Sequence, residues 1–201
     1  MGILPQNLPK QSYEETKTIL IRHNVDISKP AVLAVRGYYL NSMGEKKIND
    51  KGIYDDAIFM YSPAAYATFN GNTDPSKYRK GRGTGAYKGM ATLKKGVHIY
   101  RPGIHGMMLY NAGKPISSAP KKPYLAFVQA ERFTVIRDGD PDYEEKGWFG
   151  INLHMGSKTS TSSEGCQTLY PSQWFTFYNL MMDQIAYFGV KSFPYVLIEN
   201  F

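Results

Sequence analysis

One cysteine and one histidine near the C-terminal end of the chain are residue types suited to nucleophilic catalysis. Cys166 is the single cysteine among 201 residues, and His154 is one of four histidines. Both lie in the stretch 150–174, which reads GINLHMGSKTSTSSEGCQTLYPSQW. A thiol whose proton can pass to an imidazole is a nucleophile for acyl transfer. The pair is therefore the first candidate for a catalytic centre.

The sequence around Cys166 favours a reactive thiol. Gly165 and a run of Ser and Thr precede it, whereas a structural cysteine is a small buried apolar residue. A helix is expected to begin a few residues later, and its positive N-terminal end would stabilise a thiolate. Gly165 would also leave backbone N–H groups free to bind a developing oxyanion. A buried structural cysteine is the alternative interpretation.

His154 stands at the end of an apolar run, 148–154, that predicts a strand. Asn152 lies on the same side of this strand because strand side chains alternate with a period of two. Asn152 could therefore orient the imidazole of His154. The alternatives are a hydrogen-bonded core histidine and an asparagine that satisfies a buried polar site.

Three further residues could line a substrate cleft. His98, Tyr100 and His105 fall within GVHIYRPGIHG and could converge on one end of the sheet. The simpler interpretation is two surface or hairpin histidines. These histidines lack a convincing third ligand, so no metal and no cofactor is expected.

Arg36 is unusual because it follows the apolar run 31–35. A buried arginine needs a carboxylate partner, which Asp56 or Asp138 could supply. Arg36 could equally hold the carboxylate of a substrate.

The elements that must position these residues are mostly short. Residues 1–11 are expected to form a flexible arm. Ser12 and Glu15 match a capping box, which predicts a short helix that ends near residue 22. A longer helix is expected to begin near Pro171 and to end at Gly189, with an apolar face at 174, 175, 177, 178, 181 and 182.

Runs of β-branched and aromatic residues bounded by turn residues predict strands. These runs are 31–40 (interrupted at 36–37), 57–61, 65–69, 96–100, 107–110, 124–129, 133–137, 148–154 and 194–198. Residues 70–85 are expected to form a long surface loop, and 138–147 an acidic turn. The sum is a single mainly β (α+β) domain over residues 1–201, a β-sandwich or barrel with two helices.

The charge of the chain bears on its partners. The net charge is +7 and the pI is near 9.3. A basic surface favours a polyanion such as nucleic acid, anionic lipid or bacterial wall polymer, or it serves solubility alone. Lys and Arg cluster in 77–95. A binding module for nucleic acid or polysaccharide is therefore an alternative to an enzyme, with nucleic acid not favoured because no known nucleic-acid motif is present.

The N-terminal residues and the cysteine count bear on localisation. A single cysteine excludes an internal disulfide framework. The first residues lack the features of a secretory signal, and no apolar run is long enough to span a membrane. We therefore expect a chain that is made in the cytoplasm and is not inserted into a membrane. Action on a cell wall would require delivery by a phage or a secretion system.

The order of motifs from His154 onward resembles the catalytic end of the L,D-transpeptidase family. In that family a His, a Ser-His-Gly-Cys block, a helix, a Gly and a final strand follow one another. Here the block is Ser163-Glu164-Gly165-Cys166. The resemblance covers about the last third of the chain. It implies a β-sandwich catalytic domain and a thioester mechanism on the stem peptides of bacterial peptidoglycan.

By this resemblance Cys166 would be the nucleophile, His154 its base, and the amides near Gly165 and Cys166 the oxyanion hole; Ser163 matches the Ser of the block. Glu164 stands where the family usually has His, and the residue after the cysteine is Gln rather than Arg or Asn. Hydrolysis is therefore as plausible as transfer, and a phage structural protein with a degenerate version of the fold is a third hypothesis. The residues expected to contact substrate are Arg36, Tyr100, His105, Glu164 and Gln167.

Overall fold

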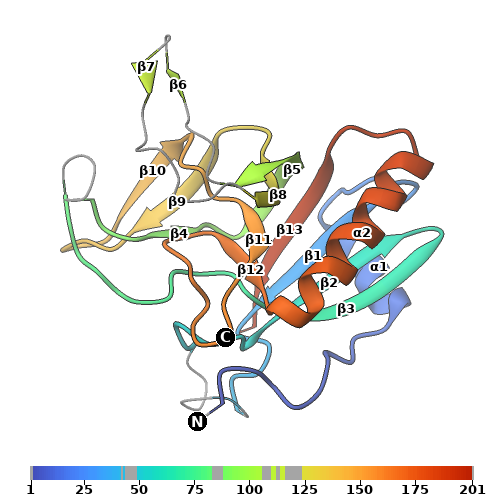
Figure 1. Ribbon diagram of the computed structural model, residues 1–201, viewed down its shortest axis with the longest axis horizontal. Helices are drawn as coiled ribbons and strands as arrows, with labels where there is room; N and C mark the ends of the chain where they lie inside the picture. The colour runs from blue at the N-terminus through green and yellow to red at the C-terminus, as the bar shows by residue number, and fades with distance from the viewer. Residues whose placement is uncertain are drawn as a thin grey trace.

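The apolar run at residues 31–35 lies in one strand of a closed eight-stranded barrel (Figure 1). The computed structural model describes residues 2–41, 43, 49–82, 88–105, 110–111, 114–115 and 124–200. The barrel order is β1-β13-β5-β8-β11-β12-β3-β2. Its strands are β1 (Ala31–Arg36), β2 (Asp56–Ser62), β3 (Ala65–Asn72), β5 (Gly96–His105), β8 (Tyr124–Gln129), β11 (Leu153–Met155), β12 (Gln167–Leu169) and β13 (Phe193–Glu199).

The other elements lie around the barrel. A three-stranded sheet has the order β10-β9-β4, and β6 pairs with β7. Within the described part of the chain there are two helices, as expected, and neither is long and apolar enough to cross a membrane. The bounds are β4 (Ala91–Leu93), β6 (Tyr110–Asn111), β7 (Lys114–Pro115), β9 (Phe133–Arg137), β10 (Tyr143–Gly147), α1 (Tyr13–Arg22) and α2 (Pro171–Tyr187). The prediction of a mainly β fold is confirmed.

Two of the strand pairs in the barrel are parallel, and one of them positions the candidate site. β11 pairs in parallel with β12, with His154 opposite Thr168 and Leu153 opposite Gln167. Cys166, directly before β12, therefore lies next to the start of β11. Leu153 is fully buried, and so is Leu169 at the end of β12, so both strands are anchored in the core.

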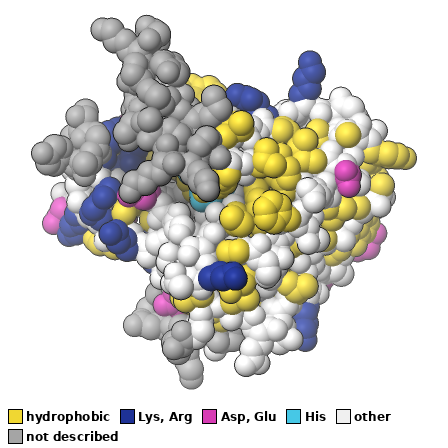
Figure 2. Space-filling view, in the orientation of Figure 1, with side chains coloured by type: hydrophobic (Ala, Val, Ile, Leu, Met, Phe, Trp, Pro, Cys, Tyr) yellow, Lys and Arg dark blue, Asp and Glu magenta, His cyan; other side chains and the backbone are white. Residues whose placement is uncertain are grey.

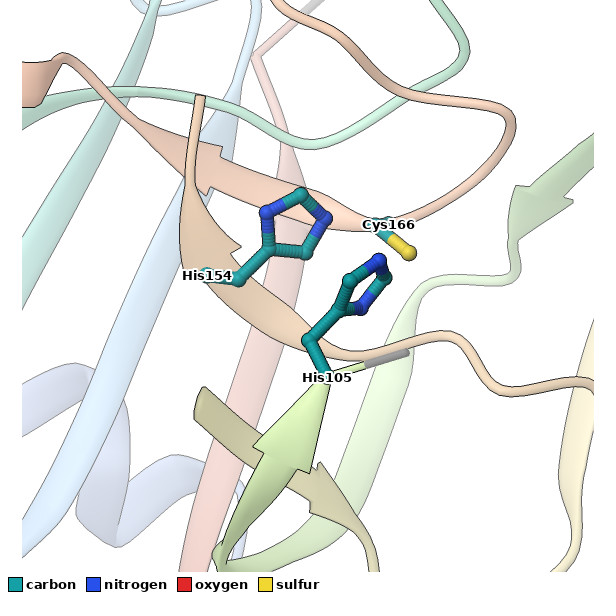
Figure 3. Close-up of side chains that lie close together, drawn as sticks. All are labelled: His105, His154 and Cys166. Atoms are coloured by element: carbon teal, nitrogen blue, oxygen red, sulfur yellow. The ribbon is translucent and has the colours of Figure 1, made fainter. Parts of the chain in front are cut away.

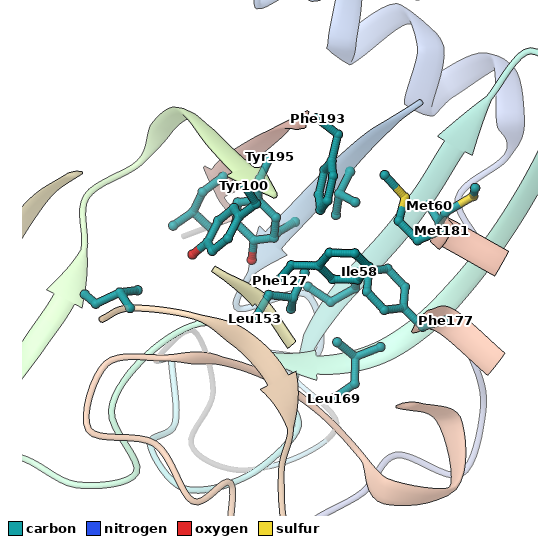
Figure 4. Packing of buried hydrophobic residues seen from close by; sticks show 14 of the residues in the cluster. Ile58, Met60, Tyr100, Phe127, Leu153, Leu169, Phe177, Met181, Phe193 and Tyr195 are labelled. Atoms are coloured by element: carbon teal, nitrogen blue, oxygen red, sulfur yellow. The ribbon is translucent and has the colours of Figure 1, made fainter. Parts of the chain in front are cut away.

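Strand β1 is buried on both faces, which explains its unbroken apolar sequence. Side chains on alternate sides of the strand enter two different clusters. Ala31, Leu33 and Val35 pack with Leu20 of α1. Val32 and Ala34 face the larger cluster, to which α2 contributes Trp174, Phe177, Tyr178, Met181 and Ile185. Figure 4 shows side chains of this larger cluster, with Phe177 and Met181 of α2 next to side chains from the strands.

The two helices begin as their sequences predict. Ser12 caps α1, because its Oγ accepts a hydrogen bond from the Glu15 N–H while the Glu15 carboxylate accepts one from the Ser12 N–H. Pro171 occupies the first turn of α2, where the missing N–H has no cost. The long helix thus starts after β12, and this placement matters for the charge state of Cys166.

The N-terminal residues contradict the expectation of a flexible arm. Residues 2–11 are bonded to the barrel and its loops at several points. The Ile3 carbonyl accepts a hydrogen bond from the Tyr54 N–H at 2.8 Å. The Asn7 carbonyl accepts one from the Tyr39 hydroxyl at 2.9 Å, and the Gln11 carbonyl one from Tyr66 at 2.6 Å. Tyrosine hydroxyls on the barrel surface hold this segment in place.

Several element boundaries also differ from the expectation. Residues 70–72 belong to β3, and Thr73 and Asp74 are buried, so the predicted surface loop begins later. The predicted acidic turn 138–147 contains strand β10. The strand predicted for 148–154 begins only at Leu153, as β11. The strands β4 and β12 were not predicted. Most of the predicted strand 107–110 falls outside the described residues.

Buried carboxylates gather where β2 begins and β3 ends. Asp55, Asp56 and Asp74 are each at most 1% exposed. Asp56 is satisfied by the N–H groups of Gly37 and Thr73, but one carboxylate oxygen of Asp55 and one of Asp74 have no partner among the described residues. Burial, followed by the charge of Asp56, raises the pKa of Asp55. Folding therefore favours the protonated form of Asp55.

Because the pKa of Asp55 is higher in the folded than in the unfolded state, its stabilising contribution is present at acidic pH. It is lost as pH rises from the ordinary carboxyl range towards the raised pKa. Asp55→Asn should therefore raise the stability at pH 8 by about 1–3 kcal/mol, the cost of a buried unsatisfied polar group, and change it less at pH 5. Thermal unfolding at both pH values measures this difference. Asp183→Asn, at an exposed site on α2, is the control, and equal shifts for both variants would contradict the assignment.

Candidate active site

Three side chains that are far apart in the sequence meet in one cluster (Figure 3). His105 ends β5, His154 lies in β11, and Cys166 directly precedes β12. Their nitrogen and sulfur ligand atoms all lie within 4.8 Å of one another. The ring centroids of His105 and His154 are 4.1 Å apart. The predicted pair of His154 and Cys166 is brought together, and His105 joins it because β5, β8, β11 and β12 are neighbours in the barrel.

His154 is oriented by a backbone carbonyl. Its side chain is 2% exposed, and its Nδ1 lies 2.7 Å from the Met155 carbonyl oxygen. Because a carbonyl only accepts hydrogen bonds, Nδ1 carries the hydrogen and Nε2 carries a free lone pair. The Tyr124 hydroxyl oxygen, 3.0 Å from Nδ1, is a second acceptor for the same hydrogen. Nε2 is buried and has no partner in the described part of the chain.

The surroundings keep His154 neutral. Burial and, to a smaller extent, the nearby His105 together lower the pKa of His154 to about 3, although the hydrogen bond to Met155 opposes the shift. Figure 3 shows one ring nitrogen of His154 on the side that faces His105 and Cys166. A neutral imidazole with an unused lone pair is the protonation state that a general base needs.

Cys166 is a thiol rather than a thiolate in this environment. The pKa of Cys166 is raised to about 11, mainly by burial and slightly by the charge of Glu164, while the hydrogen bond from the Asn152 N–H opposes the shift. The Sγ–H donates to the Gly150 carbonyl oxygen at 3.4 Å, and the Asn152 N–H donates to Sγ at 3.5 Å. The residue as a whole is partly exposed, and its sulfur carries its proton at neutral pH.

The predicted effect of a helix on Cys166 is wrong. The whole of β12 lies between Cys166 and Pro171. Five residues of extended chain span roughly 16 Å. The dipole effect falls off within the first turn of a helix, so α2 does not stabilise a thiolate at Cys166.

His105 presents a hydrogen-bond donor to the cluster. The Asn152 side-chain N–H donates to His105 Nδ1 at 3.1 Å, so the neutral ring carries its hydrogen on Nε2. Burial lowers the pKa of His105. In Figure 3 the His105 ring lies against both His154 and the Cys166 sulfur. Asn152, which was expected to orient His154, fixes the tautomer of His105 instead.

The turn before Cys166 is held by Ser163. The Ser163 hydroxyl donates to the Cys166 carbonyl oxygen at 2.7 Å and accepts from the Gly165 N–H at 3.0 Å. Ser163 is itself buried, and its backbone N–H donates a further hydrogen bond to Ser76 Oγ at 2.7 Å. Ser163 therefore positions the turn. The Gly165 N–H is already occupied, which contradicts its predicted place in an oxyanion hole.

Gly165 is required at its position for two reasons. Its φ angle is +142°, a conformation that residues with a side chain rarely adopt. A Cβ atom added there would lie 2.3 Å from the carbonyl oxygen of Ala91 in β4. Among the described residues, none accepts a hydrogen bond from the N–H of the following Cys166. That N–H is therefore the backbone donor left for an oxyanion.

Two of the predicted substrate-binding residues are buried below the site. Gln167 is fully buried; its amide N–H donates to the Gly165 carbonyl at 3.1 Å, and its oxygen accepts from the Tyr195 hydroxyl at 2.9 Å. Tyr100 is also fully buried, packed against Phe133 and Tyr195. Neither side chain can reach a substrate at the surface, so both predictions are wrong. Gln167 supports the turn instead.

Arg36 has a structural role. Its guanidinium pairs with Glu199 at 3.1 Å, and strand register places these two residues opposite each other on β1 and β13. Thr73 accepts two more hydrogen bonds from Arg36, through its hydroxyl and its carbonyl. Glu199, and not Asp56 or Asp138, is thus the carboxylate partner. The donors of Arg36 are directed at protein groups, so its predicted contact with a substrate is wrong.

Glu164 and His98 lie apart from the cluster. The Glu164 side chain is 81% exposed and forms an ion pair with Arg79 at 3.9 Å. Its predicted role in substrate contact remains a prediction. His98 is buried against Phe133, and one of its ring nitrogens lies 2.8 Å from the Lys94 carbonyl oxygen. His98 and His105 therefore do not converge.

The basic segment 77–95 is largely neutralised by carboxylates. Lys80 pairs with Asp140, Lys88 with Glu145, Lys94 with Glu144 and Lys95 with Glu199, while Arg79 approaches Glu164. Figure 2 shows charged side chains of both signs around the three-stranded sheet, whereas apolar side chains gather over α2. A surface of alternating sign holds a polyanion weakly.

Sequence reasoning missed Tyr124 and the Met155 carbonyl, whereas His105 was expected to contact substrate and does lie beside His154 and Cys166. Tyr124 is one of 16 tyrosines, and no local pattern distinguishes it. It reaches the site because β8 pairs with both β5 and β11. The pairing of strands that are far apart in the sequence therefore brings Tyr124 and His105 to the site.

No protein-family model matches the chain, and neither the curated proteins nor the solved structures contain a match to it. The function is therefore inferred from the site itself and from the motif that carries it.

Proposed function

We propose that this protein is a cysteine-dependent acyl-transfer enzyme of L,D-transpeptidase type that acts on the stem peptides of bacterial peptidoglycan. One observation carries the proposal. The only thiol of the chain lies within 4.8 Å of an imidazole nitrogen, and the Met155 carbonyl fixes that imidazole in the tautomer of a general base. A base held in this way next to a nucleophile is the arrangement used in covalent acyl transfer.

The first half of the reaction forms a thioester. As the sulfur of Cys166 attacks the peptide carbonyl carbon, the thiol proton passes to Nε2 of His154. The carbonyl oxygen becomes an oxyanion, which the Cys166 N–H and the Nε2–H of His105 can stabilise. The His154 imidazolium then donates its proton to the leaving amine as the C–N bond breaks. The acyl group is left on the sulfur.

The second half reverses these roles. Water or an amine attacks the thioester carbonyl, and His154 takes the proton of the attacking group. The C–S bond breaks, and Cys166 recovers its proton from His154. Water gives hydrolysis and an amine gives transfer. The partial exposure of Cys166 allows either acceptor to reach the acyl group.

The neutral resting state makes proton transfer part of the attack itself. Burial raises the pKa of Cys166 to about 11 and lowers that of His154 to about 3. A preformed thiolate–imidazolium pair is therefore unfavourable. The base acts only when a carbonyl is present to accept the electrons of the sulfur, which protects the single thiol from unwanted reactions.

The substrate class is supported by the sequence motif. The block Ser163-Glu164-Gly165-Cys166 after His154, followed by a helix and a final strand, resembles that of the L,D-transpeptidases. The ion pairs of the segment 77–95 give no support to a binding module for nucleic acid.

Intact-mass spectrometry of the protein mixed with soluble peptidoglycan stem peptides tests the proposal. We expect an acyl adduct on Cys166 with loss of the leaving amine, and no adduct on Cys166→Ala. Added amino-acid acceptors then distinguish transfer from hydrolysis through the mass of the product. If neither an adduct nor a product forms while a small alkylating reagent still labels Cys166, the enzyme proposal fails and a non-catalytic role for the fold is favoured.

A further inference from the structure

The three side chains of the active site also form a set of metal ligands. His105, His154 and Cys166 offer two imidazole nitrogens and one sulfur, all within 4.8 Å of one another. Imidazole and thiolate are ligands that zinc prefers, whereas calcium and magnesium require oxygen. The set therefore points to a borderline-soft cation.

A second observation indicates that one of these ligands is directed into the site. The His154 side chain is 2% exposed, and its Nε2 has no hydrogen-bond partner among the described residues. A buried polar atom without a partner costs free energy. Figure 3 shows this ring beside His105, with the Cys166 sulfur on the same side.

We propose that His105, His154 and Cys166 bind one zinc ion. Zinc bonds of about 2.0–2.3 Å in a tetrahedral site place ligand atoms about 3.3–3.8 Å apart. The ligand atoms lie within 4.8 Å, so they must approach one another by at most about 1.5 Å. Cys166 and His105 are partly exposed and have room for this movement. The fourth position is left to water.

The groups behind the ligands fit such a site. Metal-bound histidines donate their other ring N–H to a carbonyl or an amide oxygen. The Met155 carbonyl already accepts from Nδ1 of His154 at 2.7 Å. The Asn152 amide contacts Nδ1 of His105 at 3.1 Å. A half-turn of this amide would present its oxygen to Nδ1–H, which would free Nε2 of His105 for the metal.

Binding exchanges one proton for the metal. The Cys166 thiol releases its proton to solvent, and a sulfur–zinc bond replaces the S–H bond without any change of oxidation state. The zinc site itself needs no catalysis. Its consequence rests on the proposed function: zinc occupies both the nucleophile and the base, so micromolar zinc would switch off acyl transfer, and a chelator would restore it.

Titration of the metal-free protein with Co²⁺ tests the site without any turnover. We expect one Co²⁺ per chain with a thiolate-to-cobalt charge-transfer band, which Zn²⁺ then removes. Cys166→Ser should abolish the band. His105→Ala and His154→Ala should each weaken binding at least about tenfold, and Asn152→Ala about tenfold. His23→Ala, which changes a histidine at the end of α1, should leave the titration unchanged.

Protection of Cys166 in the unaltered protein provides a check that needs no variant to fold. Equimolar Zn²⁺ should slow alkylation of Cys166, and EDTA should restore the rate. No charge-transfer band, a band that survives in Cys166→Ser, or an equal loss of affinity in His23→Ala would overturn the zinc site. A band without an acyl adduct in the metal-free protein would instead remove the proposed enzyme function and leave the zinc site in place.

Discussion

Replacing His154 by alanine is expected to slow thioester formation at Cys166 by about 10²–10⁴-fold, the range that a positioned general base contributes. The reason is that burial raises the pKa of Cys166 to about 11, so the sulfur cannot attack unless a base takes its proton. His154 is the imidazole with the free lone pair. The rate of adduct growth in single-turnover mass spectrometry measures this effect.

A second variant separates the loss of the base from a loss of structure. His154→Asn can keep a donor to the Met155 carbonyl while removing the basic nitrogen, so it should fold normally and remain as slow as His154→Ala. His23→Ala is the matched control and should keep the full rate. His105→Ala should have the smaller effect, because it removes one of two oxyanion donors. A larger loss in His105→Ala than in His154→Asn would reverse the assignment of the base.

The second large effect is expected at Gly165. Gly165→Ala should destabilise the protein by about 3–5 kcal/mol and abolish acyl transfer, because both backbone strain and a collision with β4 result. The added Cβ would lie 2.3 Å from the Ala91 carbonyl oxygen. The turn and the strand must separate, and the separation moves Cys166 away from His154.

Gly96 provides the matched control for this prediction. Its φ angle is +140°, almost that of Gly165, but a Cβ atom there would meet nothing within 4 Å. Gly96→Ala should therefore cost only the backbone strain, about 1–3 kcal/mol, and should retain activity. Thermal unfolding of both variants measures the difference, at about 2–4 °C per kcal/mol for a chain of this size. Equal costs would show that the contact with Ala91 is not limiting.

Local patterns were enough to predict much of the fold. The capping box of Ser12 and Glu15 and the Pro171 start of the long helix are confirmed, because these signals act within a few residues. The strands predicted for 57–61 and 65–69 are also found, and the one predicted for 31–40 is found as far as Arg36, since alternation and β-branching are local properties. Residues 37–40 form a turn instead. Strand β10 was missed because Tyr143–Gly147 carries charges on an exposed edge and lacks an apolar run.

The environment of each polar group could not be predicted in the same way. The sequence indicated that Arg36 needs a carboxylate partner. That this partner is Glu199 depends on the parallel pairing of β1 with β13, two strands that lie far apart in the sequence. The N-terminal segment has no pattern of its own and is held by tyrosine hydroxyls from the barrel. These hydrogen-bond and ion-pair partners lie far away in the sequence. Only the closed barrel determines which of these residues come into contact.

The sequence by itself led to the prediction that Cys166 and His154 belong to one site, but it did not show that the two side chains meet. Their residue types, the small-residue loop between them and the strands that flank it are all local features, and the parallel pairing of β11 with β12 then brings them together. The tertiary structure decided the rest of the site. His105 and Tyr124 enter through strand pairing across the barrel, and burial sets the proton on the sulfur and removes it from His154. Charge state depends on the surrounding solvent and dipoles, which exist only once the chain has folded.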